Sequence, residues 1–355
     1  MTVAVRTRRK RAIGTAISVI VVVAIFSFVL PRIADLSAVW RHIRDMTGLE
    51  VIGLALVGAA NLVTSWLVIR AATPGLTIPQ AAVVSQSSTA VSNAVPGGAA
   101  VAVGVTYAML GSWGFSASRS TLSVLVSGLW DTFVKLGLPV LAITLLALQG
   151  EKAGPLGVVG VLGLAVLVGA VGLFALALRR EDVAVKAGEV AARALRGPRR
   201  LLRKDPAEGW GAATAKFRGR AIGLVRRSWL QLTVASLLNH LTLYLVLLVS
   251  LRDVGVSNDE VGWAEVLAAF AFVRLLTAIP ITPGGLGIVE VALIGACSAA
   301  GGDHAQVVAA VLVFRLLTYV VPIALGVLTY LYWRTNTTWL DSAPPLAGTE
   351  PAQAV

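Results

Sequence analysis

The sequence predicts an all-α, polytopic membrane protein, and three observations support this: composition, long apolar runs, and two Pro-Gly interruptions. Of the 355 residues, 57% are hydrophobic and 14% are charged, and the mean hydropathy is +0.82. A soluble domain carries roughly a quarter charged residues. Since a spanning helix needs about 20 apolar residues, we expect about six to eight transmembrane helices. Two interrupted runs are expected to form re-entrant hairpins in an inverted repeat.

The composition argues against several function classes. The single cysteine, Cys297, excludes an intrachain disulfide and a cysteine-based metal cluster. His42, His240 and His304 are too scattered to suggest a metal site, so we expect no metal and no cofactor. The net charge is +12, but the basic residues flank apolar runs, so we expect no nucleic-acid partner. No Walker motif is present, and the longest polar loop is too short and basic for a catalytic domain, so no enzyme activity is expected.

The basic residues predict the topology. Residues 1–12 form a basic tail before an apolar run at 13–30, which we interpret as a retained signal anchor starting in the cytoplasm. Residues 179–227 hold fourteen of the thirty Lys and Arg residues, so this loop is also expected to be cytoplasmic. It separates two membrane halves, 13–178 and 228–335. The protein is thus expected in the cytoplasmic membrane with both termini inside, and residues 336–355 are expected to be disordered.

The first half contains one apolar run that is too long for a single crossing. The run 79–112 has 34 residues and is broken at Val95-Pro96-Gly97-Gly98. Proline removes a backbone donor, and glycine tolerates the conformations that reverse a chain. If this run crossed once, the basic loop would lie outside, so we expect a hairpin opening to the cytoplasm. The other runs are read as single crossings: 13–30, 49–70, 120–148 and 155–178.

The second half repeats this plan. Its middle run, 262–300, is broken at Thr282-Pro283-Gly284-Gly285, between helices expected at 228–251 and 304–333. Counting crossings from the basic loop places the opening of this hairpin outside. Inverted repeats with broken helices that meet near the midplane are a known plan of transporters. In the basic loop, residues 183–204 fit either a helix on the inner leaflet or a solvated segment.

Ionisable residues within membrane segments are costly and are therefore functional candidates. Asp131 and Lys135 are four apart on one helical face, so they fit either a site or a structural ion pair. Glu290 follows Pro283 by seven residues, which would place it about two turns into the returning helix. Arg274, Glu290 and Arg315 could form a neutral structural cluster. Alternatively, an arginine could face an anionic headgroup, because guanidinium suits phosphate.

The hairpin tips supply uncharged donors. Helices that restart after each break expose backbone N–H groups, which favour an anion. Asn93 and Thr282 could add polar contacts or cap helices, while Ser92 is expected to cap and Asn239 and His240 to form helix-packing contacts. No catalytic or metal-binding residues are expected. The predicted substrate-binding residues are Asn93, Pro96, Gly97, Gly98, Asp131, Arg274, Thr282, Pro283, Gly284, Gly285, Glu290 and Arg315.

These motifs resemble a known family. The stretch 279–290, read as I-P-I-T-P-G-G-L-G-I-V-E, is similar to the signature of the flippase-like transmembrane family, which includes the membrane region of lysylphosphatidylglycerol synthases. Arg315, Tyr319 and Pro322 resemble its final-helix pattern R-x-x-x-Y-x-x-P. The resemblance covers most of residues 10–335 and implies a lipid flippase-like protein of the cytoplasmic membrane. The soluble aminoacyl-transferring domain is not seen in this sequence, so lysyl transfer is not implied.

The first half departs from the family pattern. Where relatives carry P-G-R-x-G-E after the first break, this chain has Gly98 and Val101 at the charged positions. The family pattern E-R-x-x-D survives only as Asp131, with Ser127 and Gly128 at the other charged positions. The poverty of charge in this half suggests a less charged or differently shaped headgroup.

The sequence thus favours translocation, or binding during translocation, of an anionic phospholipid or a polyprenyl-phosphate-linked lipid. Backbone donors at the hairpins and Arg315 would hold the phosphate, and Glu290 would orient the arginine or contact a cationic part of the headgroup. The expected partners are membrane lipids, with a homo-oligomer or a membrane enzyme also possible. Two alternatives remain: a secondary transporter of a small soluble solute, and a non-catalytic membrane partner of a glycosyltransferase.

Overall fold

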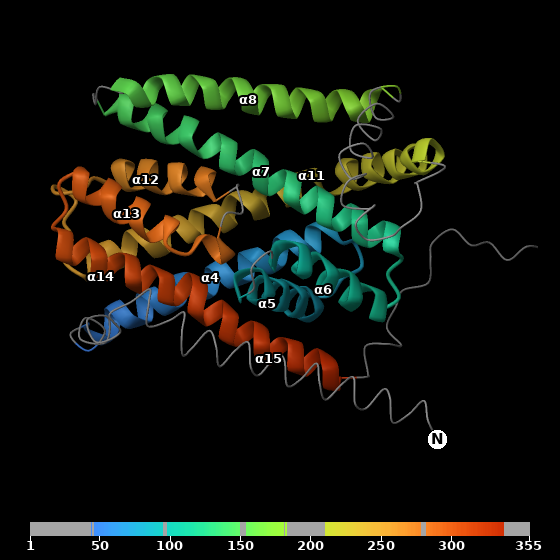
Figure 1. Cartoon of the computed structure of the whole chain (residues 1–355), viewed down its shortest axis with the longest axis horizontal. Coiled ribbons are helices and arrows are strands. Elements are labelled where there is room, and N and C mark those ends of the chain that lie inside the picture. The colour runs from blue at the N-terminus through green and yellow to red at the C-terminus, as the bar shows by residue number, and fades with distance from the viewer. Residues whose placement is uncertain are drawn as a thin grey trace, which may run out of the picture.

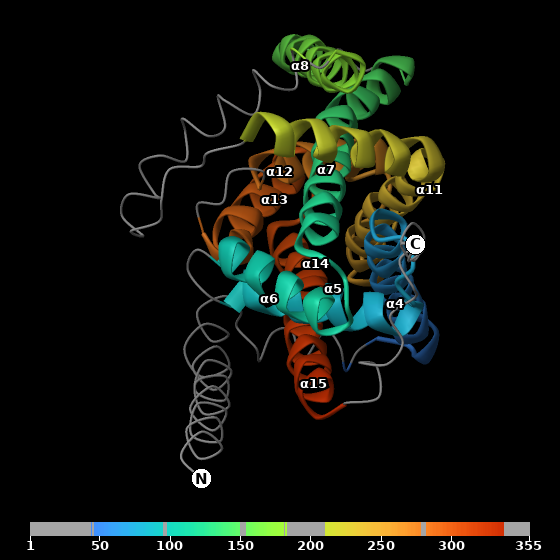
Figure 2. The same ribbon diagram turned by 90° about the vertical axis from the view of Figure 1, so that its right-hand side faces the viewer.

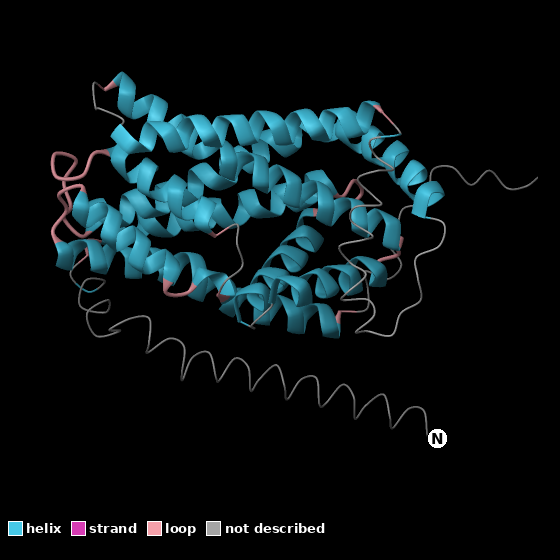
Figure 3. Cartoon of the chain, turned by 45° about the horizontal axis from the view of Figure 1, so that its top comes forward, coloured by secondary structure: helices cyan, strands magenta, loops and turns pink. Residues whose placement is uncertain are grey.

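The computed structural model is built of helices that run along its long axis (Figures 1 and 3). It describes residues 46–94, 98–149, 154–180, 210–277 and 282–336, together with Arg44 and Asp182. Within these residues no strand occurs. The chain is therefore an all-α polytopic membrane protein.

The first half contains two long helices around a short hairpin, followed by a further helix. Thr47 starts the first helix with a capping box, in which its side chain accepts from the N–H of Glu50 and the Glu50 carboxylate accepts in return. Ser116 caps the second long helix, where its side chain accepts from the N–H of Arg119. The helices are α4 (Gly48–Ala72), α5 (Ile78–Ala94), α6 (Gly98–Ser112), α7 (Ala117–Leu148) and α8 (Gly154–Arg179).

The second half repeats the order of long helix, hairpin and long helix. Its last helix is continuous through a π-helical turn, η3, and Pro322 follows this turn, where its missing N–H is accommodated. The elements are α11 (Trp210–Asp253), α12 (Trp263–Leu276), the 3-10 turn η2 (Pro283–Gly285), α13 (Ile288–Ala299), α14 (His304–Arg315), η3 (Leu316–Val320) and α15 (Val321–Thr335).

The two hairpins enter the molecule from opposite ends of its long axis. Figure 1 shows α5 and α6 joined to α4 and α7 at one end, and α12 and α13 joined to α11 and α14 at the other. The tips meet in the middle, where α5 contacts η2. In Figure 2, seen along this axis, the first hairpin lies in front of the second. Each hairpin therefore spans only part of the molecule, as predicted for a re-entrant segment.

Several helix pairs recur when the two halves are exchanged. Helix α5 packs against α15, just as α12 packs against α7, and α4 packs directly against α11. Likewise, α6 contacts α7 and α13 contacts α14. The connections match too: Gly75 and Gly255 both have positive φ, near 93° and 99°. Two residues later, Thr77 and Ser257 each exchange hydrogen bonds with the residue three positions on, Gln80 and Glu260.

The outer faces of the long helices are apolar. Four helices in the described part of the chain are long and apolar enough to cross a membrane: 48–72, 117–148, 218–253 and 304–335. Large apolar patches do not normally face water in a soluble monomer. In a membrane, the same side chains can face the lipid chains without a cost in free energy. Exposed apolar side chains include Leu49, Ile52, Leu56 and Val63 on α4, Leu162, Leu164, Val166, Val168 and Leu173 on α8, and Trp229, Leu230, Val234 and Leu237 on α11.

Two local predictions differ from the structure. Helix α11 begins at Trp210, inside the segment predicted as a loop at 179–227; its 44 residues measure about 66 Å, well beyond the hydrocarbon thickness. Glu290 lies in the first turn of α13 rather than two turns into it, because the chain stays non-helical from Leu286 to Gly287 after the break. The predicted segments 13–30 and 183–204, residues 95–97, and the tail 336–355 beyond Asn336 lie outside the described residues.

Candidate functional site

A cavity of about 760 Å³ lies where the two hairpin tips meet. Both hairpins contribute to its wall, together with α7 and α14. Its volume falls within the usual range of small-molecule sites, roughly 300–1,000 Å³. Polar residues that line it include Thr89, Ser92, Asn93, Asp131, Thr132, Lys135, Arg274, Thr277, Thr282, Arg315 and Thr318.

Arg315 is held in this wall by three contacts. Its Nε donates to Oε1 of Glu290 at 2.5 Å, and Nη2 donates to the carbonyl oxygen of Gly284 at 3.1 Å. The guanidinium carbon also lies 4.5 Å from the ring centroid of Tyr319, one helical turn on. Both Arg315 and Glu290 are only 7% exposed. The pair therefore fixes a planar cation at the cavity while Glu290 stays behind it.

The tips are locked to each other through Tyr319. Its hydroxyl donates to the carbonyl oxygen of Asn93 at 2.8 Å, which ties the end of α5 to the last helix. Gly284 adopts φ of +57°, and a Cβ at this position would meet the Tyr319 ring and Oδ1 of Asn93. Thr282 precedes η2, but its side chain makes no capping hydrogen bond; its hydroxyl donates to the carbonyl oxygen of Leu286 at 2.9 Å. Helix α13 starts without a side-chain cap, so its first N–H groups are available at the cavity wall.

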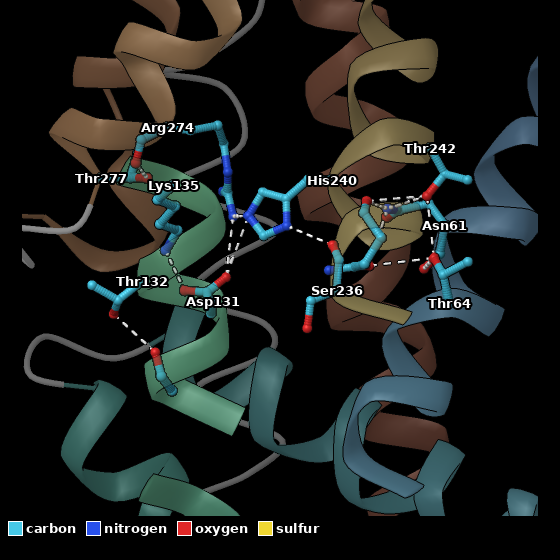
Figure 4. Close-up of polar contacts among 12 residues, drawn as sticks. Asn61, Thr64, Asp131, Thr132, Lys135, Ser236, His240, Thr242, Arg274 and Thr277 are labelled. Carbon is cyan, nitrogen blue, oxygen red and sulfur yellow. Dashed lines mark hydrogen bonds and ion pairs between the residues drawn. The ribbon is translucent and has the colours of Figure 1, made fainter. Parts of the chain in front are cut away.

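A second charged cluster lies across the cavity, between α7, α11 and α12 (Figure 4). Oδ2 of Asp131 accepts from Nζ of Lys135 at 2.6 Å. Oδ1 of Asp131 lies 3.4 Å from Nε2 of His240 and 3.9 Å from Nη2 of Arg274. The Asp131 side chain is 39% exposed while that of His240 is 2% exposed. Asp131 therefore faces the cavity, and His240 lies directly behind it.

The cavity carries an excess of positive charge. The cations are Lys135, Arg274 and Arg315, and the carboxylates are Asp131 and Glu290. With His240 neutral, three positive and two negative charges leave one positive charge. A phosphodiester carries one negative charge, so it would neutralise this site. The arginines offer N–H donors that suit phosphate oxygens.

The structure brings together almost all of the predicted site residues. Glu290 does not line the cavity but holds Arg315 from behind, and Pro96 and Gly97 lie outside the described residues. Asn239 forms the expected contact between helices, through Asn61 and Thr64 of α4. The predicted residues in the cavity wall are Asn93, Gly98, Asp131, Arg274, Thr282, Pro283, Gly284, Gly285 and Arg315.

Sequence reasoning missed the part that two residues play in this site. His240 was expected to form only a packing contact, but it joins Asp131 and Arg274 from another helix. Tyr319 was noticed only as part of a pattern, although it connects Arg315 to the first hairpin. Its spacing of four from Arg315 was the available signal. Among the residues described, no group of three or more His, Cys, Asp or Glu side chains gathers that could hold a metal ion.

The fold and site define a class: a polytopic α-helical membrane protein with two hairpins whose tips meet at a charged cavity. Residues 12–326 match the family described as the lysylphosphatidylglycerol synthase TM region, and the chain belongs to this family. The family resemblance predicted from residues 279–290 and from the final-helix pattern is thus confirmed. The family suggests a function related to membrane lipids. No curated protein matches the chain in the comparison made.

Proposed function

We propose that this protein translocates, or binds during translocation, the headgroup of an anionic lipid across the cytoplasmic membrane. The observation that supports this most directly is the cavity of about 760 Å³ with Arg274 and Arg315 in its wall. A charged cavity between apolar helices has no role in a purely structural membrane protein, because buried ionisable groups are expensive there. The family to which the chain belongs supplies the lipid context.

The phosphate is the part of the ligand that this site would hold. Arg315 is fixed by Glu290, Gly284 and Tyr319, so its orientation is set before a ligand arrives. Such preorganisation lowers the entropic cost of binding. The uncapped start of α13 adds backbone donors on the same side of the cavity. A phospholipid or a polyprenyl-phosphate-linked lipid offers the required phosphate, and its chains would remain in the bilayer.

The two halves would provide the motion. We interpret them as an inverted repeat because several helix pairs and the loop contacts of one half recur in the other. In such folds, alternating access comes from one repeat moving against the other around a fixed site. With the basic loop in the cytoplasm, the first hairpin opens inward and the second outward. The energy would come from an ion gradient, from removal of the lipid at the far leaflet, or from neither, as in a scramblase.

The test combines lipid identification with reconstituted transport. We expect the purified protein to retain one phosphate-bearing lipid above its share of the membrane, and Arg315→Ala to lose this enrichment. The matched control is Arg334→Ala, which removes an exposed arginine at the end of α15, beside Tyr330. The same lipid should cross proteoliposomes with the wild type and the control but not with Arg315→Ala.

Two results would redirect the assignment. Bulk lipid composition in all samples, together with uptake of a soluble anion that is indifferent to lipid, would favour a secondary transporter. Bulk composition without any transport would favour a membrane partner that acts only beside another protein, such as a glycosyltransferase. Either result would overturn the lipid proposal.

A further inference from the structure

We propose that His240 is a proton-binding site coupled to the anion site, so that one proton and one anionic headgroup bind together. This inference rests on the proposed function and goes beyond it by naming a coupling ion. The observation behind it is the set of contacts that His240 makes just behind the cavity wall (Figure 4). Histidine is the side chain best suited to exchange a proton near neutral pH.

One ring nitrogen of His240 is committed. Nδ1 lies 3.0 Å from the carbonyl oxygen of Ser236, one turn earlier on α11. A carbonyl can only accept, so Nδ1 must carry a hydrogen. The single free lone pair of the neutral ring is therefore on Nε2. This tautomer is inferred from the acceptor and fixes which nitrogen takes up a proton.

Nε2 faces both an anion and a cation. Oδ1 of Asp131 lies 3.4 Å away, and Nη2 of Arg274 lies 3.5 Å away. In the neutral ring, Nε2 can accept from Arg274. In the protonated ring, Nε2–H can donate to Asp131, and Arg274 loses its acceptor. Protonation thus turns Asp131 toward His240 and frees the Arg274 guanidinium for a phosphate in the cavity.

The surrounding charges determine the direction of coupling. The charged groups that face His240 are Asp131 and Lys135 from α7 and Arg274 from α12. Helix α4 brings uncharged Asn61 and Thr64, and Arg315 of α14 is engaged by Glu290 across the cavity. A proton would add a third cation beside one carboxylate. An incoming phosphate offsets this charge, so anion and proton favour each other.

The repeat supports a specific role for this position. Asn239-His240-Leu241-Thr242 on α11 corresponds to Asn61-Leu62-Val63-Thr64 on α4. The Asn and the Thr occur in both halves, and the residue directly after the Asn is leucine in one half and histidine in the other. Packing at this position thus does not require an ionisable side chain.

The experiment measures proton uptake directly. Dihexanoyl phosphatidylglycerol, whose phosphodiester stays ionised, is titrated into the full-length protein in two buffers with different ionisation enthalpies. We expect uptake of at most one proton per bound lipid. Because the complex then holds more protons than the free protein, affinity should rise as pH falls, by no more than about tenfold per pH unit. His240→Asn keeps a donor for Ser236, while His304→Asn changes a histidine at the start of α14 as control.

Each outcome decides a different point. Uptake that is present in the wild type and in His304→Asn but absent in His240→Asn supports the coupling. Binding without uptake overturns the coupling and leaves the proposed function intact, whereas absence of binding overturns the coupling together with the phospholipid as the proposed ligand. Uptake that persists in His240→Asn places the proton elsewhere. If that variant does not fold, the protein with His42→Asn and His304→Asn leaves His240 as its single histidine, and its imidazole resonances must shift toward the charged form on lipid addition.

Discussion

Nδ2 of Asn61 on α4 lies 3.0 Å from the main-chain carbonyl oxygen of Asn239 on α11 and 3.4 Å from its side-chain oxygen. Three residues on, the hydroxyls of Thr64 and Thr242 lie 3.1 Å apart. Both helices share the pattern Asn-x-x-Thr-x-(Trp or Tyr)-Leu-Val, at 61–68 and at 239–246. Residues at the same places in this pattern thus meet each other, which is the arrangement that the proposed twofold repeat predicts between these two helices.

These contacts should stabilise the junction of the halves. Hydrogen bonds between membrane helices contribute about 0.6 kcal/mol on average and up to about 1.7 kcal/mol. Asn61→Ala removes both bonds, whereas Asn239→Ala removes only the bond to the side-chain oxygen, since its main-chain carbonyl can still accept from Asn61. Each variant should lower the free energy of unfolding, and the double variant should lose less than the sum, because the contact between the two side chains is lost in both. Reversible unfolding in mixed micelles measures this cycle. Additive effects would mean that the two side chains do not interact.

Much of this architecture could be predicted from the sequence. The Pro-Gly breaks at Pro96 and Pro283 marked the hairpins, and the basic residues gave a topology in which the hairpins oppose each other. Most of the site could also be predicted, since an ionisable residue in an apolar run must have a partner. This argument singled out Asp131, Arg274 and Arg315 before any distance was known.

The features that the sequence did not predict include contacts between residues that lie far apart in the chain. His240 is 34 residues from Arg274 and more than a hundred from Asp131, and no local pattern reveals that they meet. The prediction that Glu290 lies two turns into the returning helix was wrong. The backbone after Pro283 adopts positive φ at Gly284, Gly285 and Gly287, so the helix restarts later than expected. The early start of α11 was missed because arginines on an exposed helix face resemble a loop by hydropathy.

The opposed hairpins make a topological prediction. Gly111 at the end of α6 and Asp303 before α14 are both exposed and lie at opposite ends of the molecule. In a Cys297→Ala background, Gly111→Cys should react with an impermeant thiol reagent only from the cytoplasmic side, and Asp303→Cys only from outside. Labelling of both from one side of intact cells would rule out the inverted arrangement.

Glu290→Gln should impair translocation without unfolding the protein. The amide oxygen can still accept from Arg315, but the arginine charge is no longer neutralised, so the anion should be held more tightly and released more slowly. We expect transport to fall about tenfold, equivalent to about 1.4 kcal/mol. Glu265→Gln, which alters a capping residue at Gly262, is the control for losing one carboxylate. Unchanged transport in Glu290→Gln would remove this residue from the mechanism.

Alanine substitutions at two glycines can distinguish the effect of disrupting the contact at the hairpin tips from the effect of backbone strain. Gly284 and Gly287 have φ of +57° and +79°, so alanine at either position costs about 1–2 kcal/mol. Only Gly284 lacks room: an added Cβ would press on the Tyr319 ring and lie 2.9 Å from Oδ1 of Asn93, while nothing lies within 4 Å at Gly287. Gly284→Ala should therefore abolish transport, and Gly287→Ala should lower stability only. Equal transport by the two variants would show that the Asn93–Tyr319 contact at the tips is dispensable.

Gly128 tests whether the cavity binds an anion. It lines the cavity from α7, and nothing lies within 4 Å of an added Cβ. It stands twelve residues after the N-cap Ser116, as Arg315 stands twelve residues after the N-cap Asp303, so the two positions correspond in the proposed repeat. Arginine also favours a helix by about 1 kcal/mol relative to glycine.

Gly128→Arg should therefore fold and add a third guanidinium to the cavity wall, besides those of Arg274 and Arg315. A hydrogen bond to a charged group contributes about 1.5–3 kcal/mol, so dihexanoyl phosphatidylglycerol should bind at least about tenfold more tightly. Gly128→Gln matches the bulk without the charge and should bind as the wild type does or more weakly. The gain in Gly128→Arg should shrink with added salt if it is electrostatic. Equal affinities for the two variants would show that the ligand does not present its negative charge at this wall.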